Sequence, residues 1–170
     1  MNFETRHILR WGIPGWYFIA NVFFLVGSYK GYGIYQNTEA LLSSILIILL
    51  GVPLGFVIYQ PYHAVSHVFS KDFTLEWNTM LYNEECNDKR EFLSRRYAYM
   101  LTVLHGYGSL ISSIILSLLL IFIFLFANNL ELNIFLIQIL INIFLLIVSL
   151  INYFYTQKNF NNFVSRFILK

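Results

Sequence analysis

Three histidines are the residues of this chain whose types and spacing could support metal chemistry. His63 and His67 are four residues apart, so they would share one face of a helix, and His105 precedes a later apolar segment. Neutral imidazole is a favoured ligand of zinc and iron, and a tetrahedral site needs about four donors. The alternative is that these imidazoles only hydrogen-bond to the backbone or to lipid headgroups. We therefore predict no cofactor and keep a zinc or iron site at these histidines as an alternative hypothesis.

A charged stretch, EECNDKREFLSRR at residues 84–96, is the second group that could do chemistry. Its simplest interpretation is the solvated face of a helix. The alternative is a contact surface for a cytosolic protein, or for a nucleotide-like ligand whose phosphate would be held by basic side chains. The net charge of +2 is too small for direct nucleic-acid binding to be expected. The basic candidates for the contact are Lys89, Arg90, Arg95 and Arg96.

Uncharged polar side chains form stripes within the apolar segments. At helical spacing each stripe falls on one face, which should turn away from lipid toward other helices or toward water. Amides and hydroxyls of this kind commonly join membrane helices, and in an oligomer they could instead line an aqueous pore. We keep both interpretations open for Asn21, Ser109, Ser113, Ser117, Gln138, Asn142, Ser149 and Asn152.

The composition indicates a bilayer as the solvent in which these groups are positioned. Of the 170 residues, 58% are hydrophobic and only 12% are charged. Four uncharged apolar segments approach or reach the length of about 20 residues that a spanning helix needs. The sequence therefore predicts an all-α integral membrane protein whose four transmembrane helices cover residues 13–29, 40–59, 107–127 and 133–155.

Basic residues indicate the orientation of these helices. If both termini are cytoplasmic, ten of the eleven lysines and arginines lie on the inner side, and only Lys30 lies outside. Cytoplasmic segments carry such an excess. We therefore predict a multi-pass protein of the inner membrane with cytoplasmic N- and C-termini.

Three further segments complete the predicted organisation. Residues 1–12 form an interfacial amphipathic segment, residues 60–106 a helical cytoplasmic region between the two transmembrane pairs, and residues 156–170 a basic cytoplasmic tail. We expect Pro61 to interrupt the second transmembrane helix, because the residue before a proline avoids the helical region. The helix that contains Arg95 could run unbroken into the third span. The predicted anchors at the membrane interface are Arg6, Arg10, Trp11, Pro14 and Trp16.

The predicted spans contain no Asp, Glu, Lys, Arg or His, which argues against a pump or an ion-coupled transporter. Because a bundle of four helices is thin for a pore, conduction would require a homo-oligomer. With its N-terminal RHILRWGIPGW, four spans and one cytoplasmic loop, the lysine-, asparagine- and isoleucine-rich chain resembles small multi-pass membrane proteins of CRISPR and other prokaryotic anti-phage systems. That resemblance implies an accessory factor or effector acting on the inner membrane.

The functional prediction is a non-enzymatic protein that perturbs or permeabilises the bilayer under control of its cytoplasmic segment. Two alternatives remain from other classes. One is a metal-dependent membrane enzyme that acts on a lipid headgroup through the histidines. The other is a structural subunit of a larger membrane complex.

Overall fold

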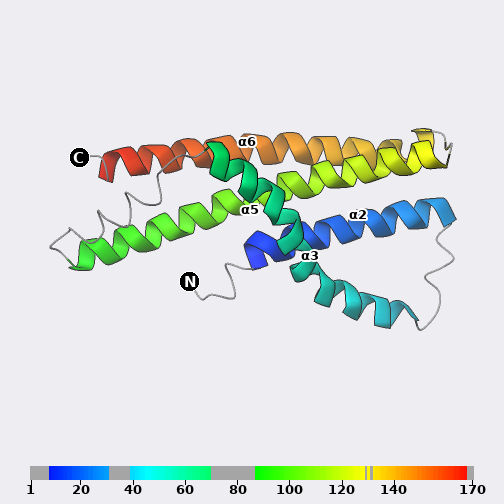
Figure 1. The fold of residues 1–170 in the computed structure, drawn as a ribbon, viewed down its shortest axis with the longest axis horizontal. Helices are drawn as coiled ribbons and strands as arrows, with labels where there is room; N and C mark the ends of the chain where they lie inside the picture. The colour runs from blue at the N-terminus through cyan, green and yellow to red at the C-terminus, as the bar shows by residue number, and fades with distance from the viewer. Residues whose placement is uncertain (1–7, 31–38, 70–86, 129, 131, 168–170) are drawn as a thin grey trace.

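The computed structural model describes residues 8–30, 39–69, 87–128, 130 and 132–167, and four long helices account for most of them (Figure 1). No strand occurs within these ranges, so the all-α prediction is confirmed there. Arg6, Cys86 and most of the predicted interfacial segment lie outside the described residues.

The two longest helices, α5 (Asn87–Ala127) and α6 (Leu136–Phe167), pack against each other as an antiparallel hairpin (Figure 1). The short 3-10 helix η3 (Leu132–Ile134) precedes α6 at the turn, where the Leu130 amide donates to the carbonyl oxygen of Leu125. Two buried clusters hold the hairpin together, one near the turn and one near the opposite end. The first comprises Leu25, Ile121, Leu125, Phe135 and Ile139, and the second comprises Leu93, Tyr97, Met100, Phe160 and Val164.

A shorter helix, α2 (Ile13–Lys30), packs along the half of the hairpin that contains the turn (Figure 1). Leu25 enters the cluster at the turn, and the ring of Tyr29 meets that of Phe124 edge to face at 5.1 Å. A π-helical turn, η1 (Ile8–Gly12), precedes α2 and contacts α3 and α5. The predicted helix start near Ile13 is therefore confirmed, and residues 8–12 pack against the other helices.

The remaining long helix, α3 (Glu39–Phe69), packs against α2, η1 and α5 and reaches α6 through a ring contact (Figure 1). It continues through Pro53 and Pro61, so the predicted interruption at Pro61 is wrong. A proline removes one helical hydrogen bond, and contacts on both sides can hold the helix together. Tyr59 and Tyr62, which flank Pro61, both lie against the ring of His105 on α5.

Glycines let α2 and α3 approach until their backbones touch. A Cβ atom on Gly15 would lie 1.7 Å from the carbonyl oxygen of Gly51, and one on Gly55 would lie 1.6 Å from that of Trp11. Gly51 and Gly55 form a GxxxG pair, the pattern by which membrane helices commonly achieve close packing. No larger residue fits this crossing without separating the helices.

Among the described residues, two helices are long and apolar enough to cross a membrane, over Glu91–Ala127 and Leu136–Ser165. The outer face of α6 carries large apolar side chains at a spacing of seven residues. Ile137, Phe144 and Ile151 are 68%, 65% and 63% exposed. This surface suits lipid or another protein better than water.

Candidate functional site

A network of amides and one phenol joins α2 to α6. The side-chain nitrogen of Gln138 donates to the backbone oxygen of Asn21 at 3.0 Å and to its Oδ1 at 3.2 Å. Asn142 Nδ2 donates to the same Oδ1 at 2.8 Å, and Asn142 Oδ1 accepts a hydrogen bond from the Tyr17 hydroxyl at 2.7 Å. Three members of the predicted stripes thus meet across one helix interface.

Most polar groups of this amide network are engaged in hydrogen bonds with one another or with the backbone, so they are not available to water. Asn142 Nδ2 also donates to the carbonyl oxygen of Gln138, and Asn21 Nδ2 donates to that of Tyr17. Only Gln138 Oε1 is buried with no hydrogen-bond partner among the described residues of the network. A cavity of about 180 Å³ lies beside it, lined also by Ala20, Phe24 and Ile141. In this arrangement the amides act as helix-packing groups.

Two serines of α5 hold the N-terminal junction. Ser109 Oγ donates to the carbonyl oxygen of Arg10 at 2.8 Å, and Ser113 Oγ donates to that of Pro14 at 2.7 Å. The Arg10 carbonyl belongs to the π-helical turn that ends just before α2, and Pro14, the second residue of α2, has no N–H group to donate to it. The hydroxyl of Ser109 supplies a donor for that carbonyl.

The other predicted stripe residues take less part in hydrogen bonds between helices. Ser117 Oγ is buried and has no hydrogen-bond partner among the described residues. Ser149 is also buried, whereas Asn152 donates to the carbonyl oxygen of Val148 on its own helix at 2.9 Å. Among the described residues, the structure therefore joins Asn21 to Gln138 and Asn142, whereas the serines of α5 bond to the backbone of the N-terminal junction.

The tryptophans of the junction lie between helices. The ring of Trp11 meets Phe56 edge to face at 5.2 Å, and the ring of Trp16 occupies the space beside Gly51. Pro14 is fully buried. These three predicted interface anchors therefore also serve as contacts between η1, α2 and α3.

Two of the three candidate metal-binding histidines come close to a shared tyrosine. The centroid of the Tyr59 ring lies 5.4 Å from the centroid of the His63 ring and 5.8 Å from that of the His105 ring. Tyr62 contacts His105 at 5.7 Å and reaches Tyr153 of α6 at 6.2 Å. His105 Nδ1 is buried with no hydrogen-bond partner in the described part of the chain.

The side chain of His67 lies outside the described residues, so the complete histidine trio is not observed. Among the described side chains, no group of three or more histidine, cysteine or acidic residues could hold a metal ion. The described imidazoles instead form an aromatic cluster where α3 crosses α5.

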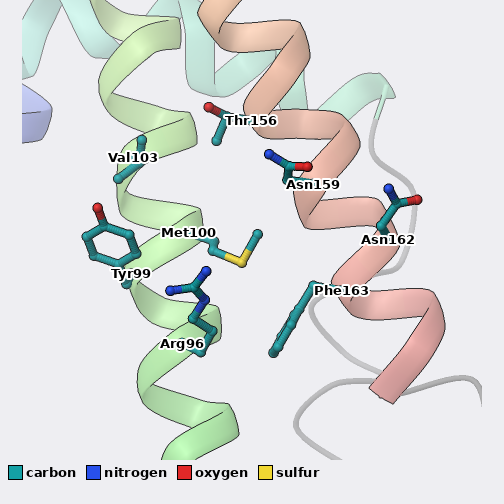
Figure 2. Close-up of a pocket in the computed structure, with 8 residues that line it drawn as sticks. All are labelled: Arg96, Tyr99, Met100, Val103, Thr156, Asn159, Asn162 and Phe163. Carbon is teal, nitrogen blue, oxygen red and sulfur yellow. The ribbon is translucent and has the colours of Figure 1, made fainter.

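The predicted basic contact surface divides into two parts. Arg95 forms an exposed ion pair with Glu91, four residues earlier on α5. Arg96 lines a cleft of about 560 Å³ between α5 and α6 (Figure 2). The side chains of Lys89 and Arg90 lie outside the described residues.

Polar residues of α6 complete the cleft opposite Arg96 (Figure 2). The asparagine-rich run QKNFNNF at residues 157–163 was visible in the sequence, but nothing in it indicated which helix its amides would face. The cleft also has rings and apolar side chains. It is lined by Arg96, Tyr99, Met100, Val103, Thr156, Asn159, Asn162 and Phe163.

Comparison of the chain with protein family models, curated protein sequences and solved structures finds no match. The resemblance to membrane proteins of anti-phage systems therefore rests on architecture alone.

Proposed function

We propose that this chain is a non-enzymatic inner-membrane protein that assembles into oligomers and permeabilises or perturbs the bilayer. Its four helices each cross the membrane, with both termini in the cytoplasm, and the ends of α5 and α6 form a cytoplasmic extension that controls it. An accessory or effector role in anti-phage defence would use such an activity.

One observation carries this proposal: α5 and α6 are continuous helices with chemically different halves. Residues 107–127 of α5 are uncharged and apolar, whereas the segment before them contains Glu91, Arg95 and Arg96. At about 1.5 Å per residue, α5 extends roughly 60 Å, about twice the thickness of a hydrocarbon core. A movement of the charged half would therefore be transmitted along a rigid helix into the bilayer.

The proposed four spans are compatible with the directions of the helices. Successive helices α2, α3, α5 and α6 alternate in direction, and α2 lies beside the apolar half of α5 (Figure 1). The predicted outer side then corresponds to the end with the α5–α6 turn. This arrangement agrees with the distribution of basic residues along the sequence.

The exposed apolar face of α6 supports self-association. Ile137, Phe144 and Ile151 point away from the bundle, and copies of the chain can pack through this face in the membrane. In the single chain Gln138 and Asn142 hydrogen-bond to α2. A polar lumen requires that this contact open when copies assemble.

Leakage of a self-quenching dye from vesicles containing the purified full-length chain tests the proposal. We expect leakage that rises more steeply than linearly with protein density, because several copies cooperate. Gln138→Leu combined with Asn142→Leu should abolish it, whereas the control Asn161→Leu should not, since Asn161 is an exposed residue of α6 outside the polar stripe.

Leakage that is unchanged in the double variant would remove the pore-lining role. A chain that is monomeric in nanodiscs and inactive in vesicles would overturn the proposed function.

A further inference from the structure

We infer that the cleft between α5 and α6 binds a soluble phosphate-bearing ligand with a planar ring system, of the nucleotide class. This inference rests on the proposed function for the position of the bilayer, and it identifies the ligand to which the extension responds. The described residues that line the cleft all belong to α5 and α6 (Figure 2).

A cation is available in the cleft for phosphate. Glu91, the one acidic residue whose side chain the structure describes, is paired with the neighbouring Arg95. Arg96 makes no ion pair with any described residue and lines the cleft. A guanidinium group binds phosphate through two parallel hydrogen bonds, so its position suits the anionic part of the ligand.

Uncharged polar residues of α6 line the cleft as well. Thr156, Asn159 and Asn162 are spaced at intervals of three residues and lie on one face of the helix. Their side chains make no hydrogen bond to any residue that the structure describes. These hydroxyl and amide groups, which line the cleft together with a guanidinium that has no ion-pair partner among the described residues, can therefore bind phosphate oxygens, ribose hydroxyls or a base edge.

Rings and apolar side chains form the rest of the wall. Tyr99 and Phe163 offer aromatic surfaces, and Met100 and Val103 add apolar contact (Figure 2). Bases stack on aromatic side chains without a strong sequence preference. The volume of about 560 Å³ is within the range of small-molecule sites and is much larger than an inorganic phosphate requires.

The depth of the cleft favours a soluble ligand over a lipid headgroup. Arg96 precedes the apolar segment that begins at Tyr107 by about 16 Å along the helix axis. A headgroup layer adds only about 5–8 Å on each side of the hydrocarbon core. The guanidinium therefore lies on the aqueous side of the headgroups.

Binding of a fluorescent ATP analogue to the full-length chain in neutral detergent tests the inference. We expect saturable binding that unlabelled ATP displaces and that inorganic phosphate displaces only weakly. Arg96→Ala should weaken binding about tenfold or more, because a charge-assisted bidentate contact is lost. Asn162→Ala and Phe163→Ala should weaken it less. The matched control Arg95→Ala, which removes an equal charge outside the cleft, should leave binding unchanged.

Equal weakening by Arg95→Ala and Arg96→Ala would overturn the inference in favour of a general charge effect. So would Arg96-dependent binding to phosphatidylglycerol vesicles without nucleotide binding, since that would assign the cleft to a lipid headgroup. Leakage without nucleotide binding would remove this inference alone. Nucleotide binding without leakage would remove only the membrane-permeabilising function.

Discussion

Ser109 on α5 donates a hydrogen bond to the backbone carbonyl oxygen of Arg10, 99 residues earlier in the chain, at 2.8 Å. The bond joins α5 to the π-helical turn that precedes α2. The junction between η1 and α2 is thus held by a hydroxyl of another helix, and Ser113 repeats the contact one turn further along.

Removal of the Ser109 hydroxyl should destabilise the bundle. Ser109→Ala leaves the Arg10 carbonyl without this donor, and we expect a loss of about 0.5–2 kcal/mol in the free energy of unfolding. Equilibrium unfolding of the full-length chain in mixed micelles measures this loss in the free energy of unfolding. Ser112→Ala is the control, since no hydrogen bond of that side chain to a described residue is observed. Equal destabilisation by Ser109→Ala and Ser112→Ala would contradict a stabilising role of the hydrogen bond from Ser109 to Arg10.

Enlargement of Gly15 should separate α2 from α3. Gly15→Val puts side-chain atoms where the backbone of Gly51 already lies, so the helices must move apart. We expect a destabilisation of several kcal/mol, as for overpacking and loss of a close crossing. Unfolding in detergent is again the measurement. Ala20→Val on the exposed side of α2 serves as the control, and tolerance of both substitutions would show that the crossing is not close.

The bond between Asn21 and Asn142 should appear as an energetic coupling. A double-mutant cycle with Asn21→Ala and Asn142→Ala should give about 0.6–1.7 kcal/mol, the range for hydrogen bonds between membrane helices. The single and double variants are compared by unfolding in the same micelles. Asn152, which bonds within α6, should show no coupling to Asn21. Additive effects of Asn21→Ala and Asn142→Ala would contradict the network.

The imidazole of His105 should act through its ring rather than through its nitrogens. His105→Phe keeps the edge contacts with Tyr59 and Tyr62 and removes a buried Nδ1 that has no partner among the described residues. We expect Phe to preserve stability, whereas His105→Ala should lower it by about 1–3 kcal/mol. Loss of stability with both substitutions would indicate a polar role that the ring contacts do not explain.

Metal content tests the alternative role of the histidines. Elemental analysis of protein purified without chelators should find less than one zinc or iron per chain, and His63→Ala should not change that content. Such a result follows if His63 and His105 pack on Tyr59 as an aromatic cluster. A stoichiometric metal that His63→Ala removes would instead support the metal-dependent enzyme.

Local patterns predicted most of the helical organisation. Hydrophobic segments marked the helices, and Pro14 together with the preceding basic residues marked the start of α2 near Ile13. The prediction that the helix containing Arg95 runs into the apolar segment is confirmed by α5. The error at Pro61 arose because a local conformational preference was weighed without the tertiary contacts of Tyr59 and Tyr62.

The partners of the polar groups required the tertiary structure. Periodicity placed Asn21, Gln138 and Asn142 on faces of their helices, but a face does not specify which neighbour it meets. The sequence likewise did not specify which neighbours Arg95 and Arg96 would meet. These adjacent residues point in different directions because successive side chains on a helix are rotated by about 100°. One pairs with Glu91, and the other lines the cleft with α6.

By itself the sequence determined that the chain is helical, that it is apolar enough for a bilayer and where its charges are concentrated, since these properties depend on composition and on neighbours a few residues apart. The tertiary structure decided that glycines bring α2 onto α3, that amides hold α2 to α6 and that Arg96 lines one cleft with asparagines of α6. These contacts depend on the rotation and crossing of whole helices, which packing between residues distant in the chain selects.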